Sequence, residues 1–102
     1  MDEMKKYKLR SRVIKALAHP SRLLMVDALA GGEKCVCELT RLVGADISTV
    51  SKHLSTLKGA GVVADEKRGN KIFYRLIMCC LGQFMDCVDR VVQDRIRDES
   101  GF

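Results

Sequence analysis

The chain has 102 residues, enough for one domain with a modest hydrophobic core and too few for two. Hydrophobic residues make up 47% of the chain and aromatic residues 5%, and no apolar run reaches the roughly 18 residues of a membrane-spanning helix. The formal net charge is +5, and the basic residues concentrate in segments 1–30 and 48–75. This distribution is typical of a polyanion-binding surface, although a solvated basic surface would look similar.

Five cysteines form an odd number with no framework spacing, which argues against an extracellular disulfide scaffold. The first twelve residues, MDEMKKYKLRSR, lack the apolar region of a secretory signal. We therefore expect a single cytoplasmic domain over residues 1–102, without membrane association.

The first half of the chain predicts helices. An amphipathic helix is expected over about residues 5–18, and His19-Pro20 ends it because the residue before proline avoids the helical region. Ser21 is expected to cap a second helix, which Gly31-Gly32 stop. A short extended piece, Lys34 to Cys37, then leads into a third helix.

Segment 46–58, DISTVSKHLSTLK, predicts the helix that matters most for function. Asp46 is a good N-cap, and an apolar stripe at helical spacing follows it: Ile47, Val50, Leu54 and Leu57. The opposite side carries short hydroxylated side chains and one cation: Ser48, Thr49, Lys52, Ser55 and Thr56. Such a face can enter a DNA major groove, although a Ser-rich surface helix without a special role fits equally well. Because a short helix and the Gly44-Ala45 turn precede this segment, the pattern is a helix-turn-helix.

A β-hairpin and a final helix complete the pattern. Val62–Ala64 and Lys71–Leu76 are expected as strands, and Gly69-Asn70 is a hairpin turn signal. The cations beside the turn are suited to phosphate or minor-groove contact: Lys67, Arg68 and Lys71. The last helix, about 80–97, is more apolar than a small monomer needs, so we expect it to pair with a second copy, together with the first helix.

Four motifs now occur in order: HPSRL at 19–23, CVCEL at 35–39, STVSKHLSTLKGAGVV at 48–63, and the wing from Lys67 to Leu76. Together they resemble the ArsR/SmtB family across nearly the whole chain. The resemblance implies a mainly α fold with a β-hairpin wing, a winged helix-turn-helix that is dimeric through its first and last helices. It also implies a repressor that binds a double-stranded DNA operator and releases it on binding a metal ion or metalloid, with no organic cofactor.

The resemblance assigns roles to residues of the DNA-reading helix. It carries DNA contact to Ser48, Thr49, Ser51, Lys52 and Ser55. His53 matches a common family histidine, which we interpret as packing or hydrogen-bonding against the wing and not as a ligand. His19 and His53 are expected to be too far apart in role and in sequence to form a site.

The cysteines indicate what is sensed. Cys35 and Cys37 share a face if their segment is extended, and thiolate-only ligation selects soft acceptors. In the resembling family, C-V-C-[DE]-L at this place is a thiolate site for As(III), Sb(III) or soft divalent ions such as Cd(II). The simpler alternative is that both cysteines are small buried hydrophobes.

The arsenic-sensing pattern has a third cysteine where this chain has Thr40, a poor substitute for a thiolate. If the extended piece pairs with the end of Lys71–Ile77, Cys35 lies near Cys79 and Cys80. We choose Cys80 as the third metal ligand, with Cys79 left open. Cys87 lies two helical turns beyond Cys80, too far for one ion, and is expected to pack in the dimer interface.

We therefore predict a DNA-binding repressor with As(III) as its first candidate inducer. A thiol redox or persulfide sensor is the main alternative, in which Cys35 or Cys37 pairs with Cys79 or Cys80. An enzyme is not expected, because the chain has neither a C-x-x-C motif nor a nucleophile–base constellation. A purely structural interaction module is the third possibility, which tight, salt-sensitive duplex binding would exclude.

Overall fold

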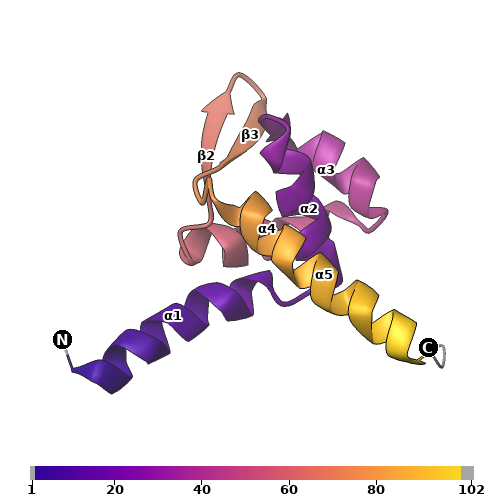
Figure 1. The fold of residues 1–102 in the computed structure, drawn as a ribbon. Coiled ribbons are helices and arrows are strands. Elements are labelled where there is room, and N and C mark those ends of the chain that lie inside the picture. Colours follow the sequence, from indigo (N-terminus) through magenta and orange to yellow (C-terminus); the bar gives the residue numbers. More distant parts are fainter. Residues whose placement is uncertain (1, 100–102) are drawn as a thin grey trace.

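The computed structural model describes residues 2–99, which measure 53 × 40 × 22 Å overall. Its elements, in chain order, are α1 (Glu3–Leu17), α2 (Pro20–Ala30), β1 (Lys34–Cys35), α3 (Val36–Val43), α4 (Ile47–Gly59), β2 (Val63–Arg68), β3 (Lys71–Leu76) and α5 (Leu81–Glu99). Helices α2, α3 and α4 form a compact body with the sheet, and α1 and α5 extend from it (Figure 1). None of the helices in the described part of the chain could cross a lipid bilayer.

Local signals place the helix boundaries. The Asp46 carboxylate accepts from the Thr49 N–H at 2.7 Å, which confirms it as the N-cap of α4. Gly44 ends α3 with φ +74°, a left-handed conformation that favours glycine, and so makes the turn between α3 and α4. One expected cap is wrong: α2 begins at Pro20, and His19 is its N-cap through Nδ1, which accepts from the Ser21 N–H at 3.1 Å.

The sheet has the strand order β1-β3-β2 and is antiparallel throughout. Arg68 pairs with Lys71 across a two-residue turn, and Gly69 supplies a φ of +62° there. Strand β2 is longer than expected because residues 65–68 continue the pairing. On the other edge of β3, Lys34 pairs with Tyr74 and Cys35 with Phe73. The expected pairing of the short extended piece with the returning wing strand is therefore confirmed.

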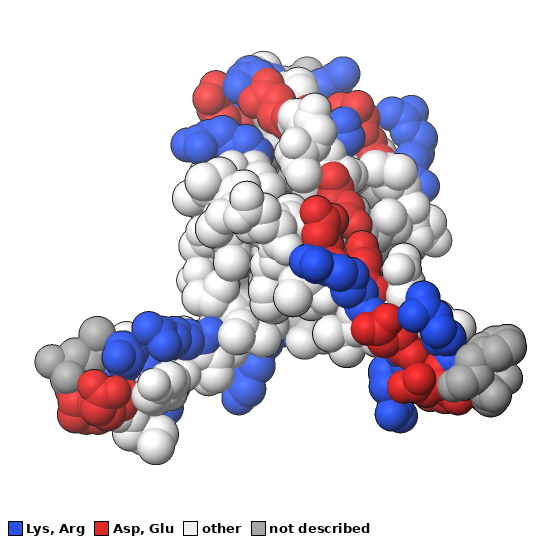
Figure 2. All heavy atoms as spheres, viewed as in Figure 1, with Lys and Arg blue, Asp and Glu red and all other residues white. Residues whose placement is uncertain are grey.

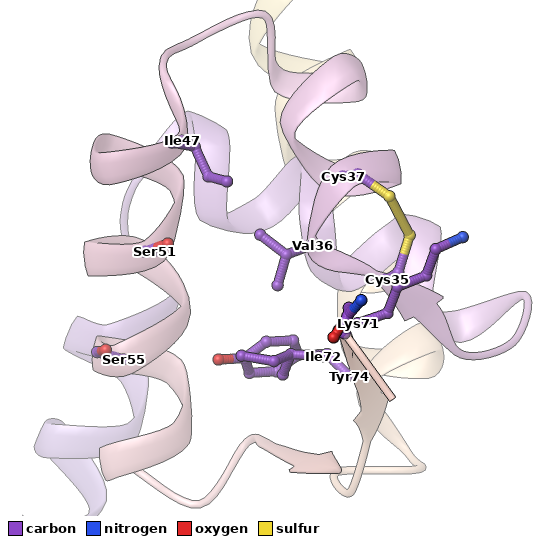
Figure 3. Close-up of a pocket in the computed structure, with 10 residues that line it drawn as sticks. Cys35, Val36, Cys37, Ile47, Ser51, Ser55, Lys71, Ile72 and Tyr74 are labelled. Atoms are coloured by element: carbon purple, nitrogen blue, oxygen red, sulfur yellow. A yellow bond between two sulfur atoms is a disulfide. The ribbon is translucent and has the colours of Figure 1, made fainter. Parts of the chain in front are cut away.

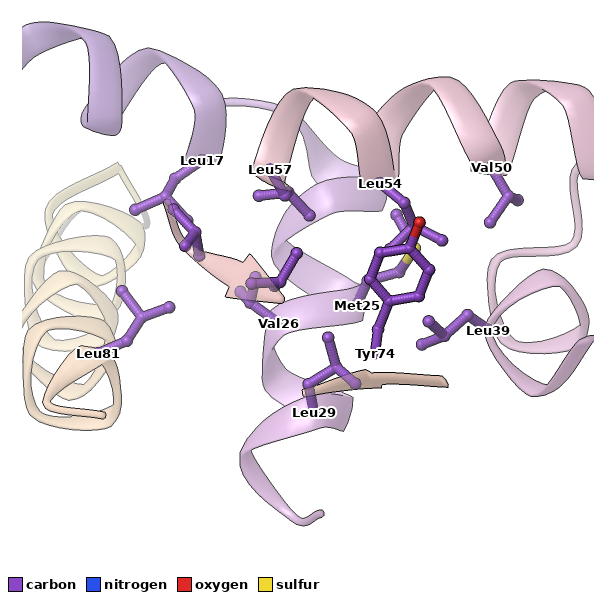
Figure 4. Close-up of a cluster of buried hydrophobic side chains, with 12 residues drawn as sticks. Leu17, Met25, Val26, Leu29, Leu39, Val50, Leu54, Leu57, Tyr74 and Leu81 are labelled. Carbon is purple, nitrogen blue, oxygen red and sulfur yellow. The ribbon is translucent and has the colours of Figure 1, made fainter. Parts of the chain in front are cut away.

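The core lies between α2, α3, α4 and the sheet. Val50, Leu54 and Leu57 of α4 are completely buried, and they pack with Met25, Leu39 and Tyr74, among others (Figure 4). Ile47 was expected in the same stripe, but it is 59% exposed. It is the first residue of α4 and does not belong to the buried cluster.

Helices α1 and α5 leave apolar side chains uncovered. The large exposed ones on these two helices are Met4, Tyr7, Leu9, Ile14, Phe84, Val88, Val91, Val92 and Ile96. Figure 2 shows that Lys, Arg, Asp and Glu gather toward the outer parts of both helices and on the wing, while much of the surface between them carries no charge. Exposed apolar side chains gathered on two helices in this way mark a candidate interaction site.

Candidate nucleic-acid interface and thiol pair

The exposed face of α4 carries the predicted DNA-contacting residues. Ser48, Thr49, Ser51, Lys52 and Ser55 are all exposed. The Ser48 hydroxyl donates to Asp46 Oδ1 at 2.8 Å, so this side chain is ordered by the cap of its own helix. The hydrogen bond from the Thr49 backbone, reinforced by that of Ser48, lowers the pKa of Asp46. The carboxylate that starts the helix therefore stays charged.

Of the three wing cations, Arg68 forms ion pairs with two carboxylates, whereas Lys67 and Lys71 form none within residues 2–99. Arg68 Nη2 donates to Glu33 Oε2 at 2.9 Å and Nη1 to Glu33 Oε1, while Nε donates to Glu66 Oε1 at 2.8 Å. These bonds raise the pKa of Arg68 and lower the pKa of Glu33, and the guanidinium also lies over the Phe73 ring. Because two carboxylates already satisfy Arg68, its first role is to fasten the wing to the loop before β1.

Lys52, Lys67 and Lys71 differ from Arg68, because none of them forms an ion pair with another side chain in segment 2–99. All three are exposed, and they sit on α4 and on either side of the hairpin turn. Their charge therefore remains available to an external anion such as a phosphate.

A polar cluster joins α4 to the α1–α2 connection, and the sequence interpretation missed it. Arg22 donates from Nε to the Ala16 carbonyl at 2.6 Å and from Nη1 to His53 Nδ1 at 3.1 Å. The His53 and His19 rings lie 4.3 Å apart between centroids. The expectation that His53 packs against the wing is therefore wrong, and the two histidines, although distant in the sequence, are in contact. Burial, followed by the nearby His19 and Arg22, lowers the pKa of His53.

Cys35 and Cys37 meet at the junction of β1 and α3. Cys35 is the last strand residue and the N-cap of α3, with extended backbone angles, while Cys37 lies in the first helical turn. Their Cα atoms are 5.4 Å apart and their sulfurs are joined as a disulfide. Glu38 supports the junction, since the Cys35 N–H donates to its carboxylate at 3.0 Å. The expected extended segment is thus shorter than predicted, yet the two thiols still meet.

The structure does not bring a third predicted ligand to this pair. Cys35 lies opposite Phe73 in the middle of β3, not beside the strand's end, and Cys37 follows it in α3. Cys79 and Cys80 are exposed just before α5, and Cys79 lies in a surface hollow with Glu33 and Arg75. Within residues 2–99, no three His, Cys, Asp or Glu side chains are arranged to hold one metal ion.

Thr40 occupies the position of the third cysteine in the arsenic-sensing pattern, and its side chain is hydrogen-bonded within its own helix. Its hydroxyl donates to the Val36 carbonyl at 2.8 Å, one turn earlier in the same helix. Cys87 is exposed on α5, where it borders the uncovered apolar side chains.

A cavity of about 390 Å³ lies between α4, the wing and the thiol pair (Figure 3). Val36 and Ile47 point into it, and the Tyr74 ring lies across it with the hydroxyl directed toward α4. Cys35, Cys37 and Ile72 complete its apolar lining, and the predicted DNA contacts Ser51, Ser55 and Lys71 also line it. We call this cavity the α4–wing groove.

A helix-turn-helix whose second helix presents hydroxyls and a lysine, followed by a cationic hairpin, defines a winged helix-turn-helix DNA-binding domain. The family described as "Bacterial regulatory protein, arsR family" matches residues 19–65. The arsenical resistance operon repressor of Staphylococcus xylosus is 39% identical over 70 residues, covering 69% of this chain and 67% of that protein. The chain belongs to the ArsR family of transcriptional repressors, which are DNA-binding regulators and not enzymes.

Two further comparisons extend over more of the chain. An uncharacterized HTH-type transcriptional regulator of Methanocaldococcus jannaschii is 33% identical over 89 residues, covering 86% of this chain and all of that protein. The homodimeric winged helix-turn-helix DNA-binding domain of a possible ArsR-family regulator from Mycobacterium bovis superposes with a TM-score of 0.78 at 28% identity, covering 96% and 93% of the two chains. The expected fold class is therefore confirmed.

Proposed function

We propose that this protein is a homodimeric repressor that binds a palindromic operator and releases it when a thiophilic species, As(III) first, binds at Cys35 and Cys37. The observation that carries the proposal is the meeting of the two sulfurs at the entrance of the helix-turn-helix. The neighbouring groups that hold this junction, Glu38 and the pairing of Cys35 with Phe73, connect the thiols rigidly to α3 and the wing. Sb(III) and Cd(II) share the same preference for thiolates.

The dimer is proposed to form through α1 and α5. Val91 and Ile96 are 60% and 58% exposed on one chain, and burying them against a second copy would remove apolar surface from water. Two copies of α4 would then face successive turns of the same DNA groove, about one helical turn apart. The homodimeric relative from Mycobacterium bovis supports a dimer, and the exposed apolar side chains of α1 and α5 support these two helices as its interface.

For inorganic As(III), Cys80 is retained as the proposed third thiolate, with Cys79 as the alternative. Because neither joins the pair within one described chain, a three-sulfur site would need segment 77–80 to shift or the second subunit to supply the donor. Replacement of Cys35 or Cys37 by Ser should abolish the response to arsenite without preventing operator binding. The matched control is Cys87→Ser, which should leave both intact.

The pairing of Cys35 with Cys37 also favours a second candidate function, a thiol redox sensor. The partners differ from those expected, since Cys79 and Cys80 are free. An operator-binding titration separates the two functions when it is run first under strictly reducing, oxidant-free conditions and then with an added oxidant or polysulfide. Release by arsenite under the reducing conditions supports the metalloid sensor, whereas release only by an oxidant or polysulfide, with a loss of two mass units per chain for a simple disulfide, supports the redox sensor.

A further inference from the structure

We propose that one face of α1 binds the DNA backbone, as a further contact element beside α4 and the wing. The face consists of cations only, and we call it the α1 stripe: Lys5, Lys8, Arg12 and Lys15. Its partner is the duplex that α4 reads, and its contacts are to phosphates. This inference rests on the proposed function, and it adds DNA contact to a helix that the proposed function uses only for the dimer.

The spacing of the α1 stripe places its residues on one side of the helix. They follow each other at intervals of three, four and three positions, and all of them are exposed. At about 100° per residue, no other residue of α1 falls within the arc that they span. Like charges at these spacings repel each other and destabilise a helix, so an anion along the row would relieve the repulsion.

The other cations of α1 have partners within the chain. Lys6 pairs with Glu3 at 3.5 Å, and Glu3 is the only acidic residue of α1. Lys6 and Arg10 also lie over the Tyr7 ring, at 5.5 and 5.3 Å from its centroid. Among residues 2–99, the α1 stripe forms neither an ion pair nor such a ring contact. Its charge therefore remains available to an external polyanion.

The α1 stripe continues onto the DNA-reading helix. Arg12 and Lys15 line a hollow of about 310 Å³ together with Thr56, near the end of α4. Thr56 lies one helical turn from Lys52, an exposed predicted DNA contact. The α4–wing groove borders α4 on a different side, which includes Ser51. The exposed face of α4 thus has the wing cations on one side and the α1 stripe on the other.

The α1 stripe matches a DNA backbone in length and charge. From Lys5 to Lys15 the helix rises about 15 Å, which corresponds to about four base-pair steps of a duplex. A single compact anion reaches only part of this row, whereas a polyanion meets all of it. An anionic membrane is the other polyanion that a basic helix can meet, but continuity with the exposed face of α4 favours the duplex.

The proposed dimer gives the α1 stripe a place on the operator. Because α1 is proposed to lie in the dimer interface, it is closer to the two-fold axis than the wing is. The α1 stripe would therefore follow the backbone between the two half-sites, while the wing contacts the outer parts.

The test measures binding of the full-length protein to a mixed-sequence duplex of about 30 base pairs, because phosphate contacts need no particular base sequence. Lys8→Gln/Arg12→Gln removes two charges from the α1 stripe. Its matched control, Lys6→Gln/Arg10→Gln, removes the same charge at the same spacing from another side of α1. Each phosphate contact contributes about 0.9 to the slope of log affinity against log salt, so the stripe variant should lower that slope by about two and the affinity about tenfold or more near 0.1 M salt. The control should lower the slope by less than half as much.

Two further measurements separate charge from folding. Lys8→Arg/Arg12→Lys exchanges the side chains and keeps both charges, so it should retain the native slope and affinity. In the native protein, lysines are acetylated with and without the duplex and located by mass spectrometry. The duplex should protect Lys8 and Lys15 but not Lys6. Sedimentation verifies that every variant has the oligomeric state of the native chain.

Equal slopes for Lys8→Gln/Arg12→Gln and its control would overturn the inference, because net charge alone would then explain both. Equal protection of Lys8 and Lys6 by the duplex would do the same. So would a stripe variant that loses binding to phosphatidylserine vesicles but keeps its affinity for the duplex, since the partner would then be a membrane. If the duplex protects Lys52 and Lys67 but not the α1 stripe, only this inference fails. If the native protein binds no duplex even at low salt, the proposed function fails as well.

Discussion

Arg22→Ala should destabilise the fold and weaken the attachment of α4 to the end of α1, because the Arg22 side chain is hydrogen-bonded to both. Its side chain makes two short hydrogen bonds, to the Ala16 carbonyl at 2.6 Å and to His53 at 3.1 Å, and a longer one to the Lys15 carbonyl at 3.4 Å. Bonds from a charged donor contribute about 1.5 kcal/mol or more each, which gives about 3 kcal/mol for the two short ones. Since the site is only partly buried, we expect a loss of about 2 kcal/mol.

The assay is urea unfolding followed by circular dichroism at one fixed protein concentration, since the stability of the proposed dimer would depend on concentration. Arg22→Lys keeps the charge but not the fork of donors, so it should recover only part of the loss. A double-mutant cycle with His53→Ala should give a coupling of about 1 kcal/mol between the two side chains. A loss below about 0.5 kcal/mol, or strict additivity in the cycle, would refute the assigned role of Arg22.

Three further predictions concern pH, the core and the wing. The pKa of His53 is lowered in the folded chain, so the unfolded chain takes up a proton first as the pH falls. The free energy of unfolding should therefore decrease as the pH drops below the ordinary His pKa of 6.5. A His53→Gln variant whose free energy of unfolding depends on pH as steeply as that of the native chain would contradict this. Leu54→Ala, at a fully buried position, should cost about 3 kcal/mol in urea unfolding, whereas the exposed control Thr56→Ala should cost less than about 0.5 kcal/mol. Lys67→Ala should reduce the slope of log operator affinity against log salt concentration by about one. Arg68→Ala should change that slope less, because Arg68 already pairs with two carboxylates. Equal slopes for the two variants would show that these ion pairs do not decide which cation contacts phosphate.

Periodicity and turn chemistry were sufficient to predict most of the fold. Asp46 marks the start of α4 through its own carboxylate, and Gly69-Asn70 sets the hairpin turn, so both signals act within a few residues and are readable in the sequence. Ile47 obeyed the helical spacing but does not belong to the buried cluster. Spacing gives the direction of a side chain, whereas burial depends on what lies opposite it.

The site was predictable only where it is local. Cys35 and Cys37 were identified because only one residue separates them, so that a short extended segment is enough to bring their thiols together. The place of Cys80 depended on strand register, and Cys35 lies opposite Phe73, three residues before the end of β3, which separates Cys80 from the pair. Two further contacts join segments that are distant in the sequence: His19 with His53, and Arg68 with Glu33. No short-range sequence pattern predicts such contacts.

The closeness of Cys35 and Cys37 along the chain has a thermodynamic consequence. Two thiols separated by one residue remain at high effective concentration when the polypeptide unfolds, because the loop between them is short. A ligand held by these two sulfurs alone can therefore also bind the unfolded chain, and it should raise the melting temperature little even when it binds tightly. A ligand that also recruits Cys79 or Cys80 must close a loop of more than forty residues, which only the folded protein does at low entropic cost. Thermal shift thus measures how many distant segments a ligand joins, independently of its affinity for sulfur.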